Sequence, residues 1–151
     1  MALLAWFSTK EYVDVSTKDA LAGEHSAGLS LEQVLSAHAA WHERFIEVMH
    51  GAKDADFELT KVYQHNHSFL GKWLHGEANT LFGHLDEYDA VCKAHEAFHG
   101  SAGVALGQHL MGNEEFAQQF LKTTYRMAFN TVKIELTNLF INSRLKPFTI
   151  N

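Results

Sequence analysis

The chain has 151 residues, and its 12 basic and 18 acidic side chains give a formal net charge of −6 when the histidines are neutral. This length favours a single domain that can bury a core without disulfides or a structural metal. The acidic balance argues against nucleic acid or an anionic membrane as a partner, because both need clustered lysine and arginine.

The first 29 residues differ in character from the rest of the chain. The stretch EYVDVST (11–17) alternates and is β-branched, and LAGEHSAGLS (21–30) is small and polar. We predict a short irregular or extended N-terminal arm over residues 1–29, followed by a helical bundle over residues 30–151. The tail PFTIN (147–151) is also extended in character.

Two helices are predicted in the first half of the bundle, where proline is absent. The first begins at Ser30, which has Gln33 in position for a capping box, and ends near Gly51. The second runs from about Phe57 to Leu74. Both carry apolar residues at three- and four-residue steps, as amphipathic helices do.

A third helix is predicted from about Leu85 to Met111, with a glycine after it as a natural stop. It contains three glycines, each of which lowers helix stability. Glycine at three- and four-residue steps lets another helix approach closely, so we expect tight packing along this stripe: Gly100, Gly103 and Gly107.

A fourth helix is predicted from Asn113 to about Arg144, which is roughly 45–50 Å at ~1.5 Å per residue. It is longer than the other three, so we expect it to break, to curve or to overhang onto a second subunit. Long amphipathic helices with short connections predict an all-α fold, an antiparallel four-helix bundle.

The cellular setting follows from the single cysteine, Cys92, which cannot form an internal disulfide and favours a reducing environment. No segment approaches the ~20 apolar residues that span a bilayer. The N-terminal MALLAWF is too short for a signal-peptide core and lacks a basic start. We therefore expect a cytoplasmic protein with no membrane partner.

Histidine is unusually frequent in this chain, which contains 11 of them. His95 and His99 are four positions apart, so on a helix they share one face and can hold one metal ion together. His38 and His42 repeat that spacing on the first helix. Two such pairs that face each other would supply three or four nitrogens to one tetrahedral ion. Five others are predicted to be surface side chains: His25, His50, His75, His84 and His109.

The motif His95-Glu96-x-x-His99 also occurs in zinc peptidases, in which the glutamate, here Glu96, is the general base. Such an enzyme needs a third ligand, an open coordination position and a substrate cleft. The third histidine would have to come from upstream, at His38, and no strand that aligns a peptide is apparent. A zinc-dependent hydrolase is therefore an alternative, and the protein is not expected to be an enzyme.

Three stretches carry a more specific signal: AHAAWHERF around His38, SFLGKWLHG in the second helix, and AHEAFHG around His95 and His99. In this order they resemble the signatures of the chemoreceptor zinc-binding (CZB) domain, over about residues 30–145. The resemblance implies a helical bundle that binds one zinc ion through three histidines and one cysteine. It implies that His38, His95 and His99 are three of the ligands.

The chain departs from that family at Ser68, which stands where the family has its zinc-bound cysteine. A serine hydroxyl is a poor zinc ligand compared with thiolate or imidazole. Four replacements are open: His65, His42, Cys92, or a water near Ser68. We favour His65, which on a continuous helix lies one turn before Ser68 and has a longer side chain than cysteine.

The resemblance implies a non-catalytic sensor or regulatory domain, since CZB domains are commonly fused to chemoreceptors or diguanylate cyclases and act as dimers. No such output module fits in the remaining residues, so we expect a standalone homodimer that signals to a separate partner or buffers zinc. Without the zinc-bound cysteine, oxidant sensing is not expected. Zinc affinity is expected to fall below about pH 6, near the reference histidine pKa of ~6.5.

A hemerythrin-like di-iron bundle is the other alternative, because it is also a histidine-rich helical bundle. Two irons normally need bridging carboxylates that face the core, such as paired Glu-x-x-His motifs. The candidate glutamates lack that repeated arrangement: Glu43, Glu58, Glu77, Glu87 and Glu96.

Overall fold

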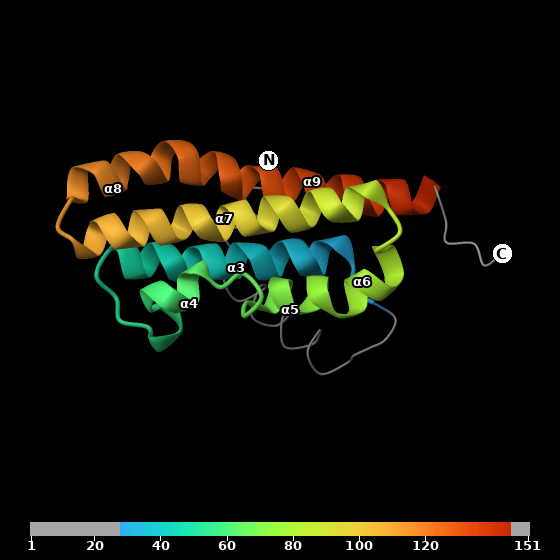
Figure 1. The fold of residues 1–151 in the computed structure, drawn as a ribbon, viewed down its shortest axis with the longest axis horizontal. Helices are drawn as coiled ribbons and strands as arrows, with labels where there is room; N and C mark the ends of the chain where they lie inside the picture. Colours follow the sequence, from blue (N-terminus) through green and yellow to red (C-terminus); the bar gives the residue numbers. More distant parts are fainter. Residues whose placement is uncertain (1–27, 146–151) are drawn as a thin grey trace.

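The structure, a computed structural model, describes residues 28–145, with the side chain of Leu145 left out. These residues are mostly helical and contain no strand, so the predicted all-α class is confirmed for this part of the chain (Figure 1). The predicted arm over residues 1–29 lies almost wholly outside the described residues, and so does the tail 147–151.

The first predicted helix is confirmed as α3 (Leu31–Met49), which starts from a complete capping box. The Ser30 hydroxyl accepts a hydrogen bond from the Gln33 backbone N–H (3.1 Å), and the Gln33 side chain accepts one from the Ser30 N–H (2.9 Å). The chain leaves the helix through Gly51, whose φ of +106° is in the left-handed region that glycine adopts easily.

The second predicted helix is wrong as a single element. The structure has a short 3-10 turn η1 (Ala55–Phe57) and α4 (Leu59–Tyr63), then a non-helical connection over residues 64–68. Two further short helices follow, α5 (Phe69–His75) and α6 (Glu77–Phe82).

The break has a local cause in Ser68, which is the N-cap of α5. Its side-chain oxygen accepts a hydrogen bond from the Gly71 N–H at 3.0 Å, and a serine that caps a new helix cannot continue an old one. Gly71 also permits the connection to fold back, because a Cβ there would collide with the carbonyl oxygen of His65. His65 and Ser68 therefore do not share a helix face as predicted.

The third predicted helix is confirmed as α7 (Asp86–Leu110). The close approach at its glycines is confirmed for Gly103, where a Cβ would overlap the ring of Tyr63 in α4. At Gly107 a Cβ would be in ordinary contact, 3.9 Å from Leu59 Cδ1, and at Gly100 it would meet nothing within 4 Å. The small residues thus seat α4 against the C-terminal half of α7.

The predicted long fourth helix is confirmed as one helical run of three parts: α8 (Glu114–Phe120), a π-helical turn η2 (Leu121–Tyr125) and α9 (Arg126–Leu145). The wider π turn is a local change of helix winding in the middle of the run. Asn113 stands at the N-cap position, but its side chain donates to the Gln108 side chain instead (2.7 Å).

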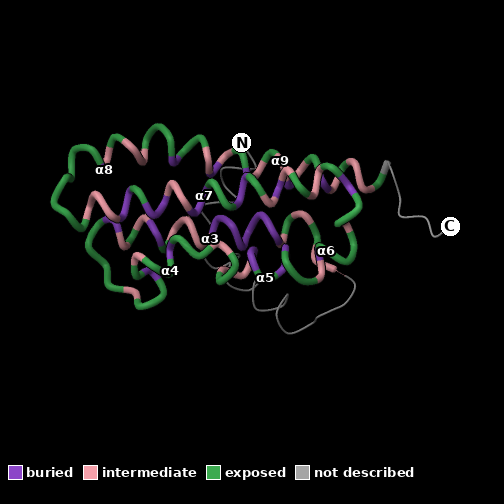
Figure 2. The backbone as a smooth tube through the Cα atoms, in the orientation of Figure 1, coloured by how far each residue is buried: buried purple, intermediate pink, exposed green. Residues whose placement is uncertain are grey.

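The helices lie along one long axis. Figure 1 shows α7 beside the α8–α9 run, and α4 also packs on α7. Helix α3 runs along the same axis and packs on α9 and α5. Buried residues follow the faces where α3, α7 and α9 meet, while α8 is mostly exposed (Figure 2). Within residues 28–145, no helix is both long and apolar enough to cross a bilayer.

Candidate metal site

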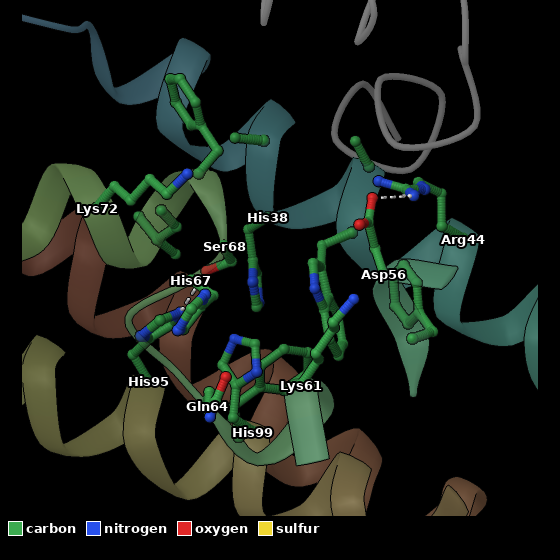
Figure 3. Close-up of a pocket in the computed structure, with 17 residues that line it drawn as sticks. His38, Arg44, Asp56, Lys61, Gln64, His67, Ser68, Lys72, His95 and His99 are labelled. Carbon is green, nitrogen blue, oxygen red and sulfur yellow. Dashed lines mark hydrogen bonds and ion pairs between the residues drawn. The ribbon is translucent and has the colours of Figure 1, made fainter. Parts of the chain in front are cut away.

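Three histidines lie in the interior between α3 and α7. His38 comes from α3, His95 and His99 come from α7, and their side chains are 2%, 1% and 2% exposed. The rings of His95 and His99 have centroids 4.6 Å apart. Figure 3 shows the three rings turned toward one shared space. The i, i+4 spacing on α7 and the inward face of α3 therefore bring together the three histidines that the sequence singled out.

Two of these rings are oriented by backbone carbonyls. His38 Nε2 lies 3.1 Å from the Phe129 oxygen, and His99 Nδ1 lies 2.9 Å from the Val62 oxygen. A carbonyl oxygen only accepts, so these ring nitrogens carry the hydrogen and donate. The lone pairs are then on His38 Nδ1 and His99 Nε2. Metal-bound histidines are held in the same way, with the second ring nitrogen donating to a carbonyl or carboxylate.

His95 carries a buried nitrogen that has no hydrogen-bond partner among the described residues. This atom is Nδ1; the other ring nitrogen, Nε2, lies 3.5 Å from the Ser68 hydroxyl. A buried polar atom without a partner costs ~1–3 kcal/mol, so it calls for an explanation. Ser68 is beside the cluster as a helix cap and a neighbour of His95.

His65 reaches the cluster from the connection between α4 and α5. Its ring centroid is 6.1 Å from that of His95, and the two rings are perpendicular at 88°. His65 Nε2 lies 3.6 Å from a carboxylate oxygen of Glu96, while Nδ1 is buried and has no partner among the described residues. Sequence reasoning missed the pairing with Glu96, because nothing local to either residue indicates it.

The other two protein candidates for the fourth ligand have partners elsewhere. His42 Nδ1 lies 2.8 Å from the Tyr125 hydroxyl, and its ring stacks on Phe129 beside α9. Cys92 hydrogen-bonds with Tyr88, and burial raises the pKa of its thiol. A raised pKa disfavours the thiolate, which is the form that binds metal.

Burial keeps the three central imidazoles neutral. Loss of hydration lowers the pKa of His38 to about 3 and that of His99 to about 4, against an ordinary value of 6.5. Burial also lowers the pKa of His95 well below that value, with a further contribution from the neighbouring histidines. Neutral imidazole with an available lone pair is the form that a metal ion requires.

A cavity of about 440 Å³ opens beside the cluster and is bordered by His38, His95 and His99. Cationic side chains lie along its wall, as Figure 3 shows: Arg44, Lys61 and Lys72. Among the described residues, the lining contains one carboxylate, Asp56, which pairs with Arg44 at 3.1 Å.

The donor set does not match that of a di-iron bundle. Among the described residues, the buried polar side chains are Ser36 and the three central histidines, with no carboxylate. Glu96, the general base of the peptidase reading, is 68% exposed and pairs with His65. The chemistry that fits these residues best is coordination of one ion by imidazole nitrogens.

As the side chains stand, no three His, Cys, Asp or Glu residues between positions 28 and 145 form a ready-made metal site. Binding therefore requires imidazole rings to rotate, and the cavity beside them gives room for this. Comparison with protein-family models, curated proteins and solved structures finds no match. The resemblance to the CZB domain thus stays a prediction from sequence motifs.

Proposed function

We propose that this chain is a non-catalytic zinc-binding regulatory domain, similar in plan to the CZB domain. Its helices form an antiparallel four-helix bundle in which the short helices α4, α5 and α6 replace one long helix. The ion is held by His38, His65, His95 and His99. Four imidazoles close the tetrahedral shell of zinc, so no position is left for a substrate and no reaction is catalysed.

The observation that carries this proposal is the set of unused nitrogens in the interior. His95 Nδ1 and His65 Nδ1 are both buried without partners among the described residues. The second nitrogens of His38 and His99 donate to backbone carbonyls, which leaves their lone pairs available. A cation that accepts these lone pairs satisfies every one of them at once.

Ser68 fits this arrangement in a different role from the family's cysteine. Its oxygen lies 3.5 Å from His95 Nε2 and accepts the Gly71 N–H. We assign it to orienting the His95 ring from outside the metal shell. His65 then takes the fourth ligand position, with Glu96 as the acceptor behind it.

Zinc would link α3, the connection over residues 64–68, and α7. The connection is not helical, so bound zinc would order it. Zinc would thereby favour one arrangement of the helices over others. A homodimer in the cytoplasm that passes this change to a separate signalling protein, of a chemoreceptor or cyclase pathway, is the role that agrees with the family resemblance.

The test is metal content and affinity in the purified full chain. We expect one zinc ion per chain by elemental analysis after dialysis. The variants His38→Ala, His65→Ala and His99→Ala should each weaken binding by more than the ~10–100-fold that loss of an outer-shell partner costs. His109→Ala is the matched control, since His109 is a histidine of α7 that pairs with Glu114 away from the site.

Unchanged zinc affinity in His38→Ala would overturn the proposed geometry. Two irons per chain with a visible chromophore would select the di-iron alternative, and turnover of a peptide by the zinc form would select the hydrolase. Loss of zinc in Cys92→Ala but not in His65→Ala would move the fourth ligand to sulfur.

A further inference from the structure

The outer side of His65 carries two more potential ligands. The ring of His75, in the last turn of α5, has its centroid 5.6 Å from that of His65. Glu96 of α7 places a carboxylate oxygen 3.6 Å from His65 Nε2. His75 is exposed and Glu96 is 68% exposed, so this group faces water. Imidazole and carboxylate are both ligands that zinc accepts.

These side chains continue into the buried cluster without a gap. Ring centroids are separated by 5.6 Å from His75 to His65, by 6.1 Å from His65 to His95, and by 4.6 Å from His95 to His99. His65 is the only member with one nitrogen at the outer group and a buried, unpartnered nitrogen on the other side of the ring, among the residues described. The four histidines form a path from solvent to the interior.

The charge around the two sides of the cluster differs. The cavity side is bordered by Lys61 and Lys72, and by Arg44, whose charge is balanced by Asp54 (2.7 Å) and Asp56 (3.1 Å). Lys61 pairs with Glu58 at 3.9 Å, so a divalent cation that enters there meets one lysine, Lys72, that has no ion pair among the described residues. The His75 side offers the Glu96 carboxylate, which attracts a cation and raises its local concentration.

We propose that His75, His65 and Glu96 form a solvent-facing entry site for a divalent cation, from which the ion passes through His65 to the buried histidines. This inference rests on the proposed function of the buried site. A neutral imidazole offers one lone pair at a time, so His65 binds the ion through Nε2 in the entry site. It binds through Nδ1 in the buried site after Nδ1 has released its proton to water and Nε2 has taken one up. The exposed His75 side chain rotates to complete the entry site.

The test is the rate at which zinc loads into the metal-free full chain, followed by stopped-flow competition with a zinc-sensitive dye. In His75→Ala the entry site loses a ligand and holds the ion less well, so we expect loading to slow by at least ~10-fold, the lower end of the on-rate gain from a raised local ion concentration. The release rate should fall in parallel, because the ion leaves by the same path. Stoichiometry should stay at one ion per chain and the affinity should be retained.

Matched controls come from a second exposed histidine–carboxylate pair at the far end of α7. His109 Nδ1 lies 2.6 Å from a Glu114 oxygen. His109→Ala should load at the wild-type rate. Glu96→Gln keeps an acceptor for His65 but removes the charge, so it should slow loading in the same direction as His75→Ala.

The outcomes separate this inference from the proposed function. If the wild-type chain binds no zinc, both fail together. If it binds zinc and His75→Ala loads at the wild-type rate, the entry site is wrong and the buried site stands; faster loading in Lys61→Glu would then place the entry at the cavity. If His75→Ala keeps its on-rate but loses affinity, His75 belongs to the equilibrium site and the entry role is overturned.

Discussion

At the scale of single residues, the candidate site depends on which nitrogen of each imidazole is available. The Phe129 and Val62 carbonyls hold one nitrogen of His38 and of His99, and Ser68 stands beside one nitrogen of His95. The two carbonyls leave the opposite nitrogens of His38 and His99 as the ones that bind, and His95 Nδ1 has no partner among the described residues. Ser68 has two contacts that can be tested together, because its hydroxyl lies beside His95 and also caps α5.

Removing the Ser68 hydroxyl should affect stability and metal affinity together. In the metal-free protein, Ser68→Ala should lower the free energy of unfolding by ~1 kcal/mol, the usual cost of losing an N-cap, as measured by urea denaturation. Ser30→Ala, which removes the cap of α3, should cost a similar amount. With zinc, only Ser68→Ala should also weaken binding. Equal zinc affinities in the two variants would exclude a role for Ser68 in orienting His95.

The buried histidines also make the metal-free protein sensitive to acid. Burial lowers the folded pKa of His38 to about 3 and of His42 and His99 to about 4, below the ordinary 6.5. Between these values the unfolded chain binds more protons than the folded chain, so stability falls as the pH falls. The expected slope is ~1.4 kcal/mol per pH unit for each histidine. In the folded metal-free protein, protons therefore compete for the His38 and His99 rings only well below pH 6.

His42 offers a way to measure this effect at a histidine that is not one of the proposed ligands. Its ring stacks on Phe129, so His42→Phe keeps an aromatic ring there but removes one titrating group. We measure the free energy of unfolding with urea between about pH 4.5 and pH 7. Its slope against pH should decrease by ~1.4 kcal/mol per pH unit, the contribution of one histidine. An unchanged slope would mean that His42 is protonated in the folded protein.

At the scale of elements, the connection over residues 64–68 positions the site. It carries His65 and Ser68, and it stands in place of the continuous helix that apolar spacing predicts. The connection folds tightly over α5 only because Gly71 has no side chain.

Adding one methyl group at two glycines should therefore have opposite effects. Gly71→Ala drives a Cβ into the His65 backbone, so both the free energy of unfolding and the zinc affinity should fall. Gly100→Ala meets nothing within 4 Å and should stabilise α7 by roughly 0.5–1 kcal/mol, the usual gain of alanine over glycine in a helix. Chemical denaturation and zinc titration measure both. A stable Gly71→Ala that binds zinc normally would show that the connection can move without consequence.

At the scale of the whole molecule, α9 presents apolar side chains on both of its faces. The inner face includes Val132 and Leu136, which are fully buried. The outer face carries Met127, Ile134 and Ile141, which are 70%, 58% and 51% exposed. They are seven residues apart, the spacing of one position of a coiled-coil heptad. This stripe is the surface that the proposed homodimer would use.

A charge at the centre of that stripe should separate the subunits. Ile134→Glu places a carboxylate where two copies of α9 would meet, and we expect a monomer by sedimentation or light scattering. Leu81→Glu, at a 40% exposed leucine of α6, is the matched control and should leave the dimer intact. A dimer that survives Ile134→Glu would place the interface on another face, and a monomeric wild-type chain would contradict the homodimer itself.

The sequence by itself determined the features that follow from neighbours along the chain. The capping box at Ser30, the extent of α7 and the shared face of His95 and His99 all depend on residues within four positions of each other. The Ser68 cap also depends on neighbouring residues. However, the apolar spacing around Ser68 predicted one continuous helix, so the break between α4 and α5 was not predicted. Only the tertiary structure decided how the break brings His65 beside His95.

The tertiary structure also decided the partners of the imidazoles. His38 meets the Phe129 carbonyl across 91 positions of sequence, and His99 meets the Val62 carbonyl across 37. The carbonyl that meets a given ring depends on how the helices pack and rotate against each other. Periodicity predicts which residues face inward, but it contains no information on which backbone carbonyl each inward-facing ring contacts. The orientation of the imidazoles is therefore set only when the helices pack together.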